Sequence, residues 1–297
     1  MNKKLLLATL ALILCTSFSQ SQNKKSNAIK CGEVEKLASD FKFTEGPAVD
    51  AEGNVYFTDI RNHMILIWTI ENKLDTFRTE SGRANGLYFD SNNSLVVCEG
   101  EEGRITSTST EGKLTILASK FNGQRFNQPN DLWIDPKGGI YFTDPLYGGD
   151  DKNIPQDGMH VYYILPDRSS VIRVCNDLKK PNGLIGTPNG KILYVTDAQA
   201  GKTFQYNINK NGTLDNKKLF VELGCDGMTI DTKGNLYLTP RGKSSVDIYS
   251  SSGHFLHAIE VTERPSNVCF GGKNREQLYI TARTSIYRVD INRRGIN

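Results

Sequence analysis

Short runs of apolar residues separated by turn signals dominate this chain, and no long stretch has the period of an amphipathic helix. One four-residue phrase, in most copies apolar–Tyr–apolar–Thr, recurs six times. The copies lie at residues 55–58, 95–98, 140–143, 193–196, 236–239 and 278–281. β-branched and aromatic residues in such short runs predict strands.

Each copy belongs to a larger repeat. A turn rich in Gly, Asn and Pro precedes it, as at residues 51–54 and 136–139, and a short apolar strand precedes the turn, as at 132–134 and 228–230. Further strands are predicted after the phrase, at 64–70, 203–208, 246–249 and 285–289. Four strands in a repeat of 40 to 53 residues are typical of a propeller blade. We therefore predict an all-β fold, a single six-bladed β-propeller over residues 34–297, with four-stranded antiparallel blades around a central channel. The longest spacing, between the third and fourth copies of the phrase, predicts an additional loop over one face of the propeller at residues 147–159.

One oxygen-bearing residue occupies the same place in every repeat, eleven or twelve residues before the second position of the phrase. These residues, called the polar ring below, are Glu45, Asn85, Asn130, Asn182, Asp226 and Asn267. Innermost strands line a propeller's channel, so the six should face one another. Any one of them alone is more typical of a turn in which Asn or Asp bonds the local backbone. Six aligned carboxylate or amide oxygens favour a hard divalent cation instead, above all Ca²⁺, with Mg²⁺, Mn²⁺ or Zn²⁺ as alternatives.

The first residues predict export. Lys3 and Lys4 precede a ten-residue, mostly apolar run at 5–14, and small residues at 17 and 19 suit cleavage. We predict a signal peptide at 1–19, a polar lead-in at 20–33, and a periplasmic or secreted protein with no stable membrane insertion after cleavage. A membrane anchor is disfavoured because the apolar run is short for a bilayer. A lipoprotein anchored through Cys15 is disfavoured because the large Leu14 precedes it.

Charge and cysteine content exclude other classes. Without the predicted signal peptide the chain has 34 basic and 33 acidic residues and no basic block, so a nucleic-acid partner is not expected. Five cysteines remain without a CxxC pair, which argues against a structural zinc site and favours buried thiols. Trp68 and Trp133 lie in strand patterns and are expected in the core. We expect a monomer or weak dimer with a small-molecule substrate.

The same residues resemble the family of gluconolactonase, regucalcin (senescence marker protein) and the luciferin-regenerating enzyme. The similarity runs from the Thr-Glu-Gly-Pro motif at 44–47 to the last phrase at 278–281. The segment 128–148 resembles the bacterial lactonase branch, and the motifs at 181–183 and 226–228 match other site motifs of the family. The resemblance implies a six-bladed propeller and a metal-dependent hydrolase of sugar lactones.

The resemblance also assigns roles to individual residues. It implies metal ligands at Glu45, Asn182 and Asp226. Asn130 is expected to bind the metal or the substrate. It implies further substrate contacts at Arg125, which precedes the Asn130 motif, and at Asp144 and Tyr147, which follow it. The spacing between Arg125 and Asn130 is wider than in the regucalcin branch.

The chemistry expected of such a ring is hydrolysis. A divalent cation would polarise a lactone carbonyl, and Asp226 would serve as the general base towards water. Two alternatives stay open: a metal-dependent esterase or organophosphate hydrolase, and a non-catalytic propeller that binds partners and uses Ca²⁺ for stability.

Overall fold

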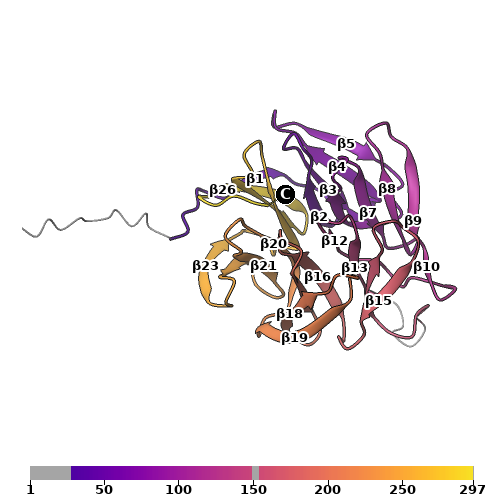
Figure 1. The fold of residues 1–297 in the computed structure, drawn as a ribbon. Coiled ribbons are helices and arrows are strands. Elements are labelled where there is room, and N and C mark those ends of the chain that lie inside the picture. Colours follow the sequence, from indigo (N-terminus) through magenta and orange to yellow (C-terminus); the bar gives the residue numbers. More distant parts are fainter. Residues whose placement is uncertain (1–27, 149–153, 297) are drawn as a thin grey trace, which may run out of the picture.

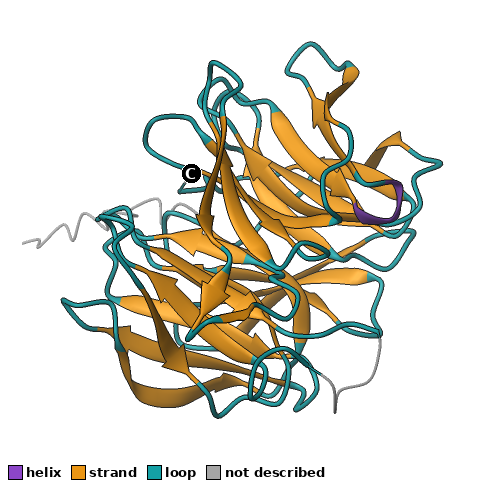
Figure 2. Cartoon of the chain, turned by 90° about the vertical axis from the view of Figure 1, so that its right-hand side faces the viewer, coloured by secondary structure: helices purple, strands orange, loops and turns teal. Residues whose placement is uncertain are grey.

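The computed structural model describes residues 28–148 and 154–296, almost all of them in strands and tight turns (Figure 1). The predicted signal peptide and residues 20–27 of the predicted lead-in lie outside the described residues, and both remain predictions. Within the described part, one 3₁₀ turn at Ile60–Asn62 is the only helix (Figure 2), and no helix is long and apolar enough to cross a membrane.

Six four-stranded antiparallel sheets follow one another along the chain, which confirms the six-bladed propeller. Blade 1 contains β2 (Thr44–Val49), β3 (Val55–Asp59), β4 (Met64–Trp68) and β5 (Leu74–Arg78). Blade 2 contains β6 (Ala84–Phe89), β7 (Leu95–Glu99), β8 (Arg104–Thr108) and β9 (Leu114–Ala118). Blade 3 contains β12 (Leu132–Ile134), β13 (Ile140–Asp144), β14 (His160–Ile164) and β15 (Val171–Cys175).

The second half repeats the plan until the last blade. Blade 4 contains β16 (Pro181–Gly186), β17 (Ile192–Asp197), β18 (Lys202–Ile208) and β19 (Leu214–Val221). Blade 5 contains β20 (Cys225–Ile230), β21 (Leu236–Pro240), β22 (Ser245–Tyr249) and β23 (Phe255–Glu260). Blade 6 contains β24 (Asn267–Gly271), β25 (Gln277–Ala282) and β26 (Ser285–Asp290), and its fourth strand is β1 (Glu35–Ala38) from the other end of the chain (Figure 1).

The core lies between neighbouring blades. The tyrosines of four phrases, Tyr141, Tyr194, Tyr237 and Tyr279, are at most 2 % exposed. Trp68 and Trp133 are buried, as predicted from their place in strands. Cys98, Cys175, Cys225 and Cys269 are buried free thiols, and the described residues contain no disulfide.

Threonines at the end of the phrase connect blades by hydrogen bonds. The hydroxyl of Thr58 in blade 1 donates to the carbonyl of Asn85 in blade 2 (3.2 Å), and that of Thr239 in blade 5 donates to the carbonyl of Ser266 before blade 6 (2.9 Å). Thr196 of blade 4 accepts from the backbone N–H of Cys225 in blade 5 (3.0 Å). The phrase thus fixes the inner strand of the following blade, which is where the polar ring begins.

Candidate functional site

A cavity of about 710 Å³ opens on the face of the propeller where the first strands of the blades begin. Its lining is polar and draws on the polar ring, on strand ends and on the segment after β13. The lining residues are Phe43, Glu45, Ile60, Arg61, Arg83, Asn85, Gly100, Gln128, Pro129, Asn130, Tyr147, Gly148, Asp226, Arg241, Arg264 and Arg283. Four of the six ring residues therefore face one space, as the repeat pattern predicts.

A β-bulge recurs at the ring position in blades 1, 2, 4 and 5, where the register between the first and second strands shifts. A bulge bends the strand and re-aims a side chain, and bulges are common beside active sites. Each bulge contains a glycine directly after the ring residue. These glycines are Gly46, Gly86, Gly183 and Gly227.

The glycines let the strands of adjacent blades approach closely. A Cβ on Gly46 would lie 1.9 Å from the carbonyl oxygen of Asn85, and one on Gly227 would lie 2.0 Å from the amide carbon of Asn267. Both contacts are too short for a real Cβ atom. The glycine that follows the acid or amide is therefore a packing requirement of the inner strands, whatever the ring residue binds.

Glu45 is buried on β2 and is held by two donors. Its Oε2 accepts a hydrogen bond from the backbone N–H of Gly46 (2.7 Å) and one from Nδ2 of Asn267 on β24 (3.0 Å). Asn267, a ring residue without a predicted role, thus orients the carboxylate of the neighbouring blade.

Asp226, on β20, faces the cavity beside Asn182 of β16. The Nδ2 of Asn182 lies 2.6 Å from Oδ1 of Asp226 and 2.6 Å from the hydroxyl of Tyr147. The backbone N–H of Tyr147 donates to Oε1 of Gln128 (2.8 Å), which also lines the cavity. The predicted residues Glu45, Asn130, Asn182, Asp226 and Tyr147 therefore belong to one site.

Burial, together with the negative charge of Asp226, raises the pKa of Glu45 well above its ordinary value. Burial likewise raises the pKa of Asp226, although the Asn182 hydrogen bond and the charges of Arg241, Arg264 and Arg283 oppose this shift. Glu45 is buried and Asp226 is partly buried, and two such carboxylates that repel each other are stabilised in their ionised form by a cation between them. We call Glu45 and Asp226 the carboxylate pair.

The donor chemistry fits a hard divalent cation. Carboxylate oxygens from the carboxylate pair and amide oxygens from Asn130 and Asn182 are available, while histidine and cysteine are absent from the lining. Within residues 28–148 and 154–296, no three His, Cys, Asp or Glu side chains gather into a metal-binding cluster. A metal would therefore be bound by two carboxylates, with neutral amide oxygens completing its coordination, which oxygen-preferring ions accept.

Asp131 was missed by the sequence analysis, although it adjoins Asn130. It stands in blade 3 where blades 1, 2, 4 and 5 have the bulge glycine, and it borders a smaller hollow. Its Oδ1 accepts a hydrogen bond from the N–H of Leu132 (2.9 Å), and burial raises the pKa of its carboxyl to about 7.

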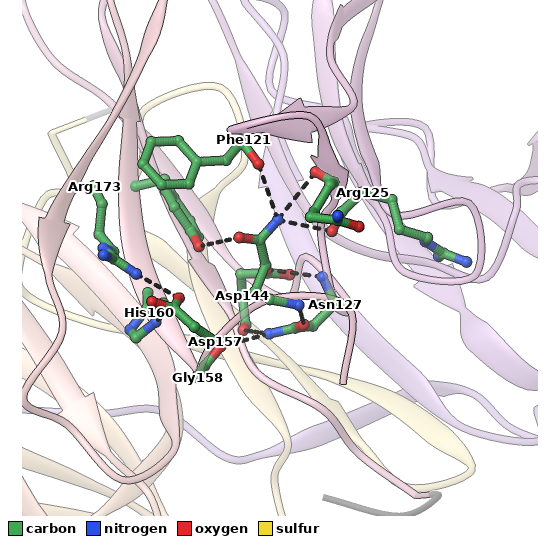
Figure 3. A network of polar contacts seen from close by, with 11 residues as sticks. Phe121, Arg125, Asn127, Asp144, Asp157, Gly158, His160 and Arg173 are labelled. Atoms are coloured by element: carbon green, nitrogen blue, oxygen red, sulfur yellow. Dashed lines mark hydrogen bonds and ion pairs between the residues drawn. The ribbon is translucent and has the colours of Figure 1, made fainter. Parts of the chain in front are cut away.

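The structure does not bring Asp144 to the cavity. Its side chain is fully buried, and one of its oxygens accepts a hydrogen bond from the backbone N–H of Asn127 (2.9 Å; Figure 3). The other oxygen accepts one from the backbone N–H of Gln128 (2.8 Å). Asp59 and Asp197 accept backbone N–H groups in the same way in blades 1 and 4. The carboxylate therefore anchors the segment that leads to Asn130.

Arg125 also lies outside the cavity lining. It belongs to a small hairpin formed by β10 (Lys120–Phe121) and β11 (Gln124–Arg125), and its guanidinium donates to the carbonyl of Glu101 (2.8 Å). The side chain of Gln156 donates to the carbonyls of Gln124 (3.0 Å) and Arg125 (2.9 Å). This network joins the hairpin to the predicted 147–159 loop, of which residues 149–153 are not described.

Five arginines of the lining were also missed. Three follow the end of the recurring phrase: Arg61 after β3, Arg241 after β21 and Arg283 after β25. Arg83 and Arg264 come shortly before the ring residues Asn85 and Asn267. Because the second strand of a blade runs antiparallel to the first, both kinds of position lie on one face. A search of the repeats for a second aligned residue type could have found them.

Comparison with known proteins identifies a family. The family model described as SMP-30/Gluconolactonase/LRE-like region matches residues 43–284. A gluconolactonase of Zymomonas mobilis is 29 % identical over 293 residues, covering 86 % of this chain and 80 % of that protein. A lactonase named drp35 of Staphylococcus haemolyticus is 24 % identical over 247 residues, covering 75 % and 71 %.

Solved structures share the fold. A gluconolactonase of Xanthomonas campestris superposes with a TM-score of 0.80 at 25 % identity, covering 87 % of this chain and 89 % of that one. A calcium-binding protein, regucalcin, of Agrobacterium tumefaciens superposes with a TM-score of 0.76 at 18 % identity, covering 89 % and 95 %. With its six blades and a family match that runs from β2 to the end of β25, this chain belongs to the SMP-30/Gluconolactonase/LRE-like family.

Proposed function

We propose that this protein is a divalent-metal-dependent hydrolase that opens sugar lactones. The observation that carries the proposal is the carboxylate pair, the buried Glu45 and the partly buried Asp226 of another blade, which share one polar cavity with neutral amides. Relatives named gluconolactonase and lactonase, which match most of the chain, support the reaction class. Oxygen ligands favour Ca²⁺, with Mg²⁺, Mn²⁺ and Zn²⁺ as alternatives.

In this proposal, Glu45, Asn130, Asn182 and Asp226 would hold the ion. A bound dication supplies positive charge for the lactone carbonyl oxygen as it becomes an oxyanion, and it favours the ionised form of nearby carboxylates. Glu45 stays fixed by Gly46 and Asn267, so its charge is held in place.

Asp226 acts as the general base. Its carboxylate takes a proton from a water molecule, whose oxygen attacks the lactone carbonyl carbon. The proton then passes to the ring oxygen as the C–O bond breaks, and the product is a hydroxy acid. Asn182 holds the position of Asp226 through their 2.6 Å contact, and Tyr147, on the other side of Asn182, is placed to bind a sugar hydroxyl.

The proposal is tested by removing bound metal with a chelator, adding back one metal at a time and measuring lactone hydrolysis. Wild-type protein is expected to open aldonolactones with at least one of Ca²⁺, Mg²⁺, Mn²⁺ and Zn²⁺. Asp226→Asn is expected to lower kcat by about 10²–10⁴-fold, the usual contribution of a general base. Asp215→Asn, at an exposed position on β19, makes the same chemical change away from the cavity and should leave kcat unchanged.

Melting curves provide a readout that does not need turnover. An ion that binds only the folded state raises the melting temperature with its concentration, by an amount equivalent to about 2.7 kcal/mol at 100 times Kd. This rise should disappear in Glu45→Gln. Metal binding without hydrolysis of any lactone or ester would contradict the enzyme and support a binding propeller. Full activity in Asp226→Asn would contradict the assigned base.

A further inference from the structure

The mouth of the cavity carries an excess of positive charge. The cavity lining contains five arginines, Arg61, Arg83, Arg241, Arg264 and Arg283, which we call the arginine crescent, and only two acids, Glu45 and Asp226. Four of the five are exposed and Arg264 is half-buried. In the part of the chain that the structure describes, none of the five forms an ion pair with a carboxylate.

The crescent occupies one side of the mouth. Its members come from blades 5, 6, 1 and 2, which are consecutive around the closed ring. The opposite side of the lining, from the segments around β12 and β13, presents the neutral groups of Gln128, Asn130 and Tyr147. Such a one-sided distribution can orient a ligand that has a charged end and a neutral end.

Several of these arginines are held in place by uncharged groups. The ring of Phe43 contacts two of them, with the guanidinium carbons of Arg61 and Arg283 at 5.5 Å and 5.9 Å from its centroid. Arg241 donates to the carbonyl of Ala198 (3.1 Å). These contacts position the guanidinium groups and leave their positive charge without a counter-charge.

The arginines also act on one another. Burial and the charge of Arg283 lower the pKa of Arg264, and Arg241 acts in the same direction, so the three lie near enough to repel. Asp226 opposes this effect, but in the proposed function its charge is taken up by the metal. A cavity that gathers unpaired guanidinium groups is complementary to an anion, since arginine binds carboxylates and phosphates through paired N–H donors.

We propose that the lactone taken by this site carries a second acidic group, a carboxylate or a phosphate, which the arginine crescent binds while the ring carbonyl lies at the carboxylate pair. This inference rests on the proposed function and narrows its substrate class. The crescent is built from strand ends on the same face as the polar ring, so one small molecule can reach both.

Three lactones that differ in charge test the inference with metal-loaded protein. D-glucono-δ-lactone is neutral, D-glucaro-1,4-lactone carries a carboxylate, and 6-phospho-D-glucono-δ-lactone carries a phosphate. At low ionic strength, kcat/KM for at least one charged lactone should exceed that for the neutral one by about tenfold or more, within the range of electrostatic steering. The advantage should shrink at high salt, because exposed charges are screened. Which charged lactone is preferred identifies the acidic group.

Variants locate the effect. Arg264→Gln and Arg283→Gln should each lower, several-fold, the ratio of kcat/KM for the preferred charged lactone to kcat/KM for the neutral lactone. Arg294→Gln removes the same charge from an exposed position outside the cavity and should leave this ratio unchanged. Melting temperatures close to the wild-type value would show that the variants fold.

The two ways of failing are distinct. If the neutral lactone is opened as efficiently as the charged ones, or if the preference survives Arg264→Gln and Arg283→Gln together, this inference is wrong and the proposed function stands. If no lactone of the three is opened with any metal, the proposed function is wrong and the inference falls with it.

Discussion

The two carboxylates of the site are each restrained by an amide from a neighbouring blade. Asn267 donates to Glu45, and Asn182 donates to Asp226. The repeats predict that amides and acids share a ring, yet they do not distinguish an amide that binds a metal from one that orients a carboxylate. That distinction depends on contacts across blade boundaries, so Asn267 received a role only from the structure. Asp144 shows the same limit of sequence-based prediction. Its position in the sequence suits the cavity, but its side chain accepts hydrogen bonds from the backbone before β12 of its own blade.

The buried Asp144 should make stability depend on pH. Burial raises the pKa of this carboxyl to about 7, whereas it is near 3.8 in an unfolded chain. Between these values the folded state binds the extra proton, so the free energy of unfolding falls as pH rises, by at most about 1.4 kcal/mol per pH unit. Asp144→Asn lacks this contribution, so its stability should fall less steeply between pH 5 and 7.

Urea unfolding of both chelated proteins at pH 5, 6, 7 and 8 measures the two slopes. Chelation keeps metal binding from adding its own pH dependence. The other buried acids are present in both proteins, so the comparison isolates Asp144. Parallel pH profiles would contradict the raised pKa. A uniformly lower stability of the variant would report only the weaker backbone anchor.

At the scale of the element, the first strand of a blade combines a bulge, a ring residue and a glycine. The bulge turns the ring residue towards the cavity, and the glycine leaves room for the next blade. Strand identity, blade count and ring position were all predictable because they repeat with a fixed period. The hairpin of β10 and β11 was not predictable, because it occurs once and is held by side-chain contacts such as those of Gln156.

Gly46→Ala should therefore be costly. Gly46 has φ of 47°, and a Cβ there would meet the Asn85 carbonyl at 1.9 Å, so the backbone of blade 2 would have to move. We expect a loss of about 3 kcal/mol or more in the free energy of unfolding, with weaker metal binding because Glu45 is adjacent.

Gly112→Ala is the matched control for this prediction. Gly112 also has a positive φ, of 81°, but no atom lies within 4 Å of the added Cβ. It should lose only about 1 kcal/mol, the conformational part of the effect. Equal losses in the free energy of unfolding of the two variants, measured with urea, would show that the close contact between Gly46 and the backbone of blade 2 does not contribute.

The whole molecule is closed by the pairing of β1 with β26, which completes blade 6 from both ends of the chain. The ion pair between Arg288 and Glu35 spans 253 positions in the sequence. The six phrases predict the number of blades but not which strand completes the last one, because β1 has no phrase of its own. The cavity is likewise a property of the closed ring, since its lining comes from the first blade to the last.

A covalent link across this closure should stabilise the protein. Cys31 and Ile291 form an isolated antiparallel bridge, with hydrogen bonds from Gly32 to Asp290 and from Asn292 to Lys30 on either side. This is a non-hydrogen-bonded pair, whose Cα atoms lie about 4.5 Å apart, within reach of a disulfide. In the Ile291→Cys variant, the free energy of unfolding should be about 2–4 kcal/mol higher for the oxidised form than for the reduced form.

The double variant Cys31→Ser with Ile291→Cys carries the same loss of apolar volume and cannot form the cross-link. Its stability should not respond to oxidation, since Cys98, Cys175, Cys225 and Cys269 are buried. If oxidation stabilises the double variant as much as the single one, another thiol has reacted. If it stabilises neither, the two ends are not paired as described.

Sharing the last blade between distant parts of the chain also sets an order of events in folding. β1 precedes blade 1, but its partner strand, β26, follows the other blades and ends at Asp290. Blades 1 to 5 are contiguous in sequence and can form from local pairings, whereas the β1–β26 pairing brings together Glu35 and Arg288, which are 253 positions apart. Ring closure is thus a long-range step, which is the slow kind in folding. A chain whose last blade has not formed would hold β1 unpaired and its ring open between blades 5 and 1, and ligand binding would begin only after closure.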